Sequence, residues 1–129
     1  MAQIDILFQT MFERKAADLM ISVGAKPCLK ISGDITPLDE FGVVTPEDAE
    51  SVLFEIMPER NQDEFKKIND TDFAYELQGS GRFRCNVFRN RLGMGGVFRL
   101  IPDKIVTTED LGLSKAITDL CFLSKGLVV

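Results

Sequence analysis

The first sixteen residues carry the pattern of an amphipathic helix. Polar and charged side chains separate apolar ones that recur every three or four positions, so the spacing predicts a helix over about residues 3–16 with one apolar face. The apolar positions are Ile4, Leu7, Phe8, Met11 and Phe12.

Short strand-like segments follow this helix. Residues 18–23 (DLMISV) are typical of a strand, and residues 24–27 (GAKP) of a turn. Leu29 and Ile31 lie in a second strand, which ends at Gly33-Asp34, and a third short strand begins at Ile35. This succession favours an antiparallel sheet.

Two helices are expected in the middle of the chain. Residues 45–48 (TPED) form a helix start, with a hydroxyl cap, a proline in the first turn and two acids near the positive end of the dipole. This helix ends before Pro58, and the next one uses Phe65 and Ile68 as its apolar anchors. The inward positions of the first helix are Ala49, Val52, Leu53 and Ile56.

A strand at residues 72–77 (DFAYEL) leads through Gly79-Ser80-Gly81 into a predicted hairpin. Alternation places Phe83, Cys85 and Val87 on one side of this hairpin, and Arg82, Arg84 and Asn86 on the other. Residues 93–96 (GMGG) lack the GxxxxGK[ST] pattern of a phosphate loop, and we interpret them as the flexible hairpin turn. Strand pairing would then bring Arg99 close to the face of Arg82 and Arg84.

The C-terminal part is predicted to hold two short helices and the start of a strand. Residues 107–110 (TTED) resemble a capping box, and Ser114 is expected to cap a helix that ends near Leu123. Residues 126–129 (GLVV) have the composition of a buried strand. The fold class that follows is α+β, a PAS-like domain in which helices pack on an antiparallel sheet.

Composition excludes several classes of function. The 129 residues carry a formal net charge of −5 and no histidine, which excludes serine–histidine and cysteine–histidine catalysis and the usual zinc spacings. The three cysteines are expected to be buried free thiols. No apolar run reaches the length of a membrane span and no signal-peptide pattern is present, so a cytoplasmic location is expected.

Arginine is concentrated in one segment. Residues 82–102 hold five of the seven arginines and no acid. Guanidinium groups gathered on strands suggest a phosphate clamp, because each offers several donors in a planar fork. The structural alternative is local ion pairing with Asp70, Asp72 or Glu76, and composition alone favours it slightly. A nucleic-acid surface is disfavoured by a pI near 4.7.

Three segments, in order, resemble the N-terminal domain of the PilT-type ATPases, hexameric motors of the type IV pilus within the secretion-ATPase superfamily. They are AADLMISVGAKPCLKISGDI, FRCNVFRNRLGMGGVFRLIP, and DLGL followed by KGLVV. The resemblance implies a PAS-like domain at residues 1–125, and at 126–129 the first strand of a truncated RecA-like domain. No Walker A or B motif is present, so no catalytic residue is expected in this chain; the full-length enzyme would use ATP and Mg, which this chain alone is not expected to bind.

The resemblance also implies a nucleotide-contacting role for arginines. Arg84 and Arg99 match the family's phosphate-binding positions, with Arg82 and Arg91 as further candidates, and no metal ligand is expected here. The position where the family commonly has a histidine is Met20. The implied partners are a neighbouring subunit's RecA-like domain, in a homohexamer, and a platform protein at the inner membrane, with no nucleic acid. The alternative is a free-standing PAS-like module that binds an anion or a protein.

Overall fold

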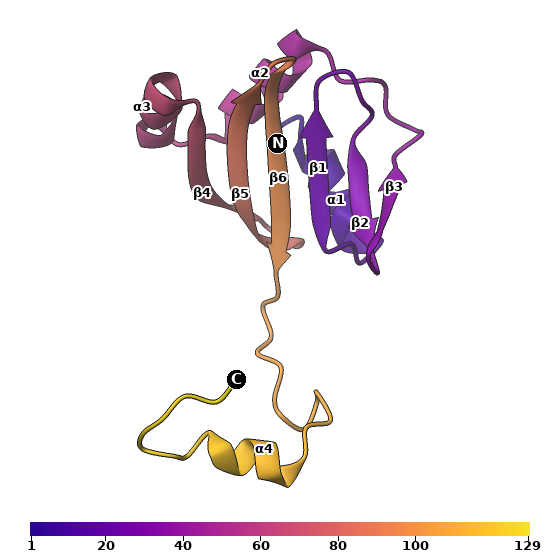
Figure 1. The fold of residues 1–129 in the computed structure, drawn as a ribbon. Helices are drawn as coiled ribbons and strands as arrows, with labels where there is room; N and C mark the ends of the chain where they lie inside the picture. Colours follow the sequence, from indigo (N-terminus) through magenta and orange to yellow (C-terminus); the bar gives the residue numbers. More distant parts are fainter.

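The elements of this chain assemble into one sheet with helices on a single face, followed by an extended C-terminal segment (Figure 1). The computed structural model describes all 129 residues. The helices are α1 (Asp5–Glu13), α2 (Pro46–Ile56), α3 (Glu59–Ile68) and α4 (Lys115–Leu120). The strands are β1 (Asp18–Ser22), β2 (Cys28–Ile31), β3 (Asp34–Pro37), β4 (Asp70–Leu77), β5 (Gly81–Asn90) and β6 (Gly93–Ile101).

The sheet has six strands in the order β3-β2-β1-β6-β5-β4, and all neighbours are antiparallel. Two three-stranded meanders are therefore joined through the pairing of β1 with β6. In Figure 1, α1 and α2 lie behind the sheet and α3 lies beside β4, while no element covers the front face. This arrangement confirms the α+β, PAS-like class expected from the sequence.

Alternation along the strands explains why only one face is buried. Phe83, Cys85 and Val87 of β5 are completely buried, as the pattern predicted, and Phe98 faces the same way from β6. The Phe8 ring of α1 stacks on Phe83 with ring centroids 4.4 Å apart and meets Phe98 edge-on at 5.3 Å. These aromatic contacts fix α1 against the middle of the sheet.

The start of α2 has the predicted capping box. The Thr45 hydroxyl accepts a hydrogen bond from the Asp48 backbone N–H, and the Asp48 carboxylate accepts one from the Thr45 N–H. Ala49, Leu53 and Ile56 are buried as expected. Two other expectations were wrong, because Ile68 at the end of α3 is 62% exposed and Phe12 of α1 is 46% exposed.

The prediction that residues 93–96 form the hairpin turn was wrong, because all four lie in β6. The turn is at Arg91-Leu92, where the Asn90 side-chain oxygen accepts hydrogen bonds from the N–H groups of Leu92 and Gly93. Glycine is needed inside the strand for space. A Cβ at Gly95 would lie 2.9 Å from the Phe88 ring, and one at Gly96 would lie 2.6 Å from the Phe98 ring.

Residues 102–129 run away from the sheet (Figure 1). Thr107 and Asp110 make the reciprocal hydrogen bonds of a capping box, but the chain forms only a turn there and no helix. Ser114 occupies the N-cap position of α4 without a side-chain capping bond, and α4 ends at Leu120 rather than near Leu123. Residues 126–129 form no strand in this structure.

The cysteines differ in their surroundings. Cys85 is buried, Cys28 is half-buried and Cys121 is exposed, so the expectation of three buried thiols was wrong for Cys121. None of the four helices has the length and hydropathy that crossing a bilayer requires.

Candidate functional site

The open face of the sheet carries one row of charged side chains. The strand registers place Lys30 of β2 opposite Asp18 of β1, Asp18 opposite Arg99 of β6, and Arg99 opposite Arg84 of β5. Neighbouring strands are about 4.8 Å apart, so the charges follow one another closely across four strands. From β2 to β5 the charges of the row are positive, negative, positive and positive.

Asp18 and Arg99 form the central ion pair of this row. The guanidinium donates from Nε to Asp18 Oδ1 over 2.8 Å and from Nη2 to Oδ2 over 3.2 Å. The Asp18 side chain is 9% exposed and that of Arg99 is 68% exposed. The hydrogen bonds from Arg99 lower the pKa of the Asp18 carboxyl against the opposing effect of burial, and the charges of Arg99 and Lys30 lower it further. The carboxylate therefore stays charged although little of it meets solvent.

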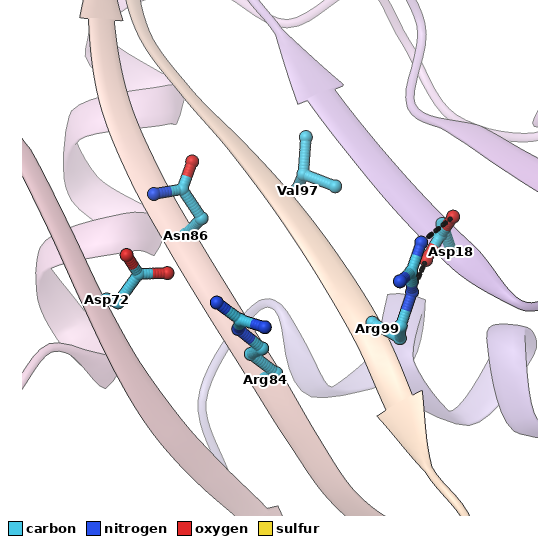
Figure 2. Close-up of a pocket in the computed structure, with 6 residues that line it drawn as sticks. All are labelled: Asp18, Asp72, Arg84, Asn86, Val97 and Arg99. Atoms are coloured by element: carbon cyan, nitrogen blue, oxygen red, sulfur yellow. Dashed lines mark hydrogen bonds and ion pairs between the residues drawn. The ribbon is translucent and has the colours of Figure 1, made fainter. Parts of the chain in front are cut away.

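Arg84 is exposed and takes part in none of the ion pairs of the structure. Its backbone lies directly across from that of Arg99, so two like charges lie on adjacent strands, although the Arg99 guanidinium turns toward Asp18 and away from Arg84. Both arginines line a hollow of about 260 Å³, and Figure 2 shows the side chains that surround it. The hollow is lined by Asp18, Asp72, Arg84, Asn86, Val97 and Arg99.

The structure brings only some of the predicted arginines together. Arg84 and Arg99 meet at the hollow, and Arg82 follows on the same face of β5, opposite Ile101 and beside a second hollow that it shares with Glu76. Arg91 is in the hairpin turn, seven positions beyond Arg84, which along an extended strand is about 23 Å. The geometry therefore supports Arg84 and Arg99 as a pair and leaves Arg91 apart from them.

The carboxylate that pairs with Arg99 was missed from the sequence. Asp18 is the first residue of the strand predicted at 18–23, whereas the sequence indicated Asp70, Asp72 or Glu76 as the partners for ion pairing. None of these three forms an ion pair with an arginine, and Asp70 instead accepts a hydrogen bond from Asn86. Asp18 and Arg99 are 81 residues apart and meet only because β1 pairs with β6.

This arrangement is suited to binding an anion rather than to bond breaking by itself. Arg84 offers its complete set of donors, and Arg99 retains the N–H groups that Asp18 does not use. Planar guanidinium groups bind phosphate or carboxylate oxygens through two parallel hydrogen bonds. The nearby carboxylate of Asp18 is already occupied by Arg99, so it is not a free general base.

Comparison with known proteins gives the following relatives. The chain is 32% identical over 114 residues to the type IV pilus retraction ATPase PilT of Pseudomonas aeruginosa, covering 88% of this chain and 33% of the relative. It is 30% identical over 127 residues to the type IV pilus ATPase PilU of the same organism, covering 98% of this chain and 33% of the relative. No protein-family model matches the chain.

A solved structure shares the fold. The crystal structure of the pilus retraction motor PilT with bound ADP superposes with a TM-score of 0.79 at 30% sequence identity, covering 94% of this chain and 35% of that one. The chain thus spans about a third of the length of the relatives that it matches.

Proposed function

We propose a function from the premise that this chain is an N-terminal domain of the PilT-type ATPase family. We infer that it serves a hexameric type IV pilus retraction motor by presenting arginines to the phosphates of ATP. The matched relatives are named as pilus ATPases, and the solved PilT structure contains ADP. The motor itself would lie in a RecA-like domain, with residues 126–129 as its first strand.

The observation that carries the proposal is the unpaired Arg84 opposite the ion-paired Arg99, on a face of the sheet that no helix covers. Two facing cations are unfavourable unless an anion lies between or above them. A triphosphate held by an adjacent domain would supply that anion. Arg84 and Arg99 would then stabilise the charge that develops during phosphoryl transfer, as arginines do in other ATPases.

The remaining parts of the proposal concern the assembly. ATP and Mg would be held mainly by the RecA-like domain, with Arg84, Arg99 and, less directly, Arg82 reaching the phosphates; Arg91 would need a different conformation of the hairpin to take part. The homohexamer would form through docking of each N-terminal domain onto a neighbouring RecA-like domain. The motor would act in the cytoplasm, peripherally at the inner membrane through a pilus platform protein.

The test is ATP hydrolysis by the longer protein that contains this domain. Arg84→Ala and Arg99→Ala should each lower kcat by about tenfold or more, because each removes a charge that contacts the transferred phosphate. Arg14→Ala is the matched control, since Arg14 pairs with Glu40 far from the hollow, and its turnover should equal that of the wild type. Wild-type turnover in both hollow variants would exclude the proposed role.

A second candidate function is a free-standing module that binds an anion or a protein on the same face. The exposed Val97 and Ile101, which lie among the arginines on the open face, favour it. This function requires no hexamer and no hydrolysis. A longer protein that neither hydrolyses ATP nor assembles into hexamers, but whose arginine face binds an anion, would support it instead.

A further inference from the structure

We propose that Asp18 is a positioning residue for Arg99, which it fixes from one side so that the other edge of the guanidinium stays free for a phosphate. This inference rests on the proposed function of the hollow. It assigns a role to a residue that contacts the arginine rather than the ligand.

The geometry of the ion pair leaves the required donors free. Asp18 accepts from Nε and Nη2, which form the side edge of the Arg99 guanidinium. Nη1 has no hydrogen-bond partner in the protein, and each Nη carries two N–H groups. The end edge, formed by Nη1 and the second N–H of Nη2, can therefore donate two parallel bonds to a phosphate while the bonds to Asp18 persist. Figure 2 shows the bonds to Asp18 on one side of Arg99, with Arg84 on the other.

The burial of the pair is asymmetric, as a positioning role requires. The Asp18 side chain is 9% exposed and held within the sheet, whereas 68% of the Arg99 side chain is exposed. A free arginine on a surface has many rotamers, and ordering them on binding opposes affinity. A fixed carboxylate at the side edge removes part of that cost before the ligand arrives.

The charges of the row argue against the opposite role, in which Asp18 would compete with phosphate for Arg99. Asp18 is flanked by Lys30 on β2 and by Arg99 on β6, so two cations compensate its negative charge. The hollow itself is lined by two arginines and two carboxylates, while Lys30 lies on the far side of Asp18. The charge of Asp18 is therefore shared between two cations, and neither Asp18 nor Asp72 pairs with Arg84.

The decisive variant is Asp18→Glu, because it keeps the charge and moves the carboxylate by one methylene. Asp34→Glu is the matched control, since Asp34 is an exposed aspartate on β3 that lies outside the hollow and forms no ion pair. Two quantities are measured on this chain by NMR. The first is hydrogen exchange of the Arg99 Nε–H without ligand, and the second is the affinity for inorganic triphosphate at millimolar concentrations, from shifts at Arg84 and Arg99.

We expect slow exchange of the Arg99 Nε–H in the wild type and in Asp34→Glu, and fast exchange in Asp18→Glu. The triphosphate affinity of Asp18→Glu should fall by about fivefold, and that of Asp34→Glu should not change. Asp18→Asn gives a second measure of the exchange if the glutamate variant does not fold, because it keeps the shape and weakens the bonds to Arg99.

The outcomes separate the two proposals. If Asp18→Glu binds triphosphate as tightly as the wild type, or more tightly, while Arg84→Ala loses binding, then the positioning role is wrong and the phosphate site stands. Rapid exchange of the Arg99 Nε–H in the wild type would also overturn the positioning role. If the wild type shows no saturable response to triphosphate at Arg84 and Arg99, the hollow does not bind phosphate by itself and the positioning role is wrong, whereas the phosphate contact in the longer protein is decided by the hydrolysis of its Arg84→Ala and Arg99→Ala variants.

Discussion

Arg84 and Arg99 lie directly opposite each other on adjacent antiparallel strands, and only Arg99 has a carboxylate partner. Like charges in this position destabilise a sheet. The arginine pair therefore does not serve the stability of the fold, which indicates that it has another role. We therefore expect Arg84→Thr to raise the free energy of unfolding by about 0.5 kcal/mol at low ionic strength. Urea denaturation measures this difference, which should shrink as salt screens the repulsion.

Arg82→Thr is the control for the change in strand propensity. Arg82 is on the same face of β5 but lies opposite Ile101 and Glu76, not opposite an arginine. Its replacement should leave stability unchanged or lower it slightly. Equal gains in both variants would mean that threonine propensity, and not relief of repulsion, explains the result.

Gly96 should not tolerate a methyl group. A Cβ there would lie 2.6 Å from Cζ of Phe98, whose ring is completely buried and meets Phe8. Because the ring has no free space to enter, Gly96→Ala should destabilise the fold by about 1–3 kcal/mol in urea or thermal unfolding. Gly42→Ala is the matched control, since nothing lies within 4 Å of its Cβ position, and it should be nearly neutral.

Tyr75 should titrate at unusually high pH. Its hydroxyl donates to Asp5 Oδ1 over 2.7 Å, and burial together with this carboxylate raises the pKa of Tyr75 to about 12. It is the only tyrosine in the chain, so absorbance at 295 nm reports it alone. The midpoint should be near 12 in the folded protein and about 10 in urea.

The same shift has a consequence for stability. A folded-state pKa above the unfolded value gives stability that is complete below about pH 10 and is lost as the pH rises toward 12. The wild type should therefore lose stability more steeply than Tyr75→Phe across this window. A folded-state midpoint near 10 would show that neither burial nor the bond to Asp5 raises the pKa of Tyr75.

The three thiols should react in a fixed order. Burial raises the pKa of the Cys85 thiol to about 12, and this residue is completely inaccessible. Cys28 is half-buried with its Sγ donating to the Lys26 carbonyl, and Cys121 is exposed. Because the thiolate is the reactive form, iodoacetamide followed by mass spectrometry should label Cys121 first, Cys28 next and Cys85 only after unfolding. Early labelling of Cys85 would contradict the structure.

Alternation and turn residues predicted the strands and the capped helix well, because both depend on neighbours in the sequence. The assignment failed at Gly95 and Gly96, where the absence of side chains concealed the strand pattern. The reason for those glycines is the position of the Phe88 and Phe98 rings, which only strand pairing reveals. The local sequence pattern therefore predicts where helices and strands lie better than it predicts where packed side chains leave room only for glycine.

The candidate site was predicted in part for the same reason. Alternation correctly placed Arg84 on the face opposite Phe83 and Cys85, and pairing of the hairpin brought Arg99 beside it. The Asp18 partner depended on a strand 81 residues earlier becoming the neighbour of β6. Nothing in the spacing of charges indicates such a long-range register.

The strand order has a consequence for biosynthesis. The first strand to leave the ribosome, β1, receives its second neighbour only when β6, the last, has emerged. Until then the nascent chain exposes an unpaired apolar edge at Leu19 and Ile21, which is a site for mispairing. We expect the sheet to close only after residues 93–101 have emerged from the ribosome, because β1 and β6 cannot pair before then.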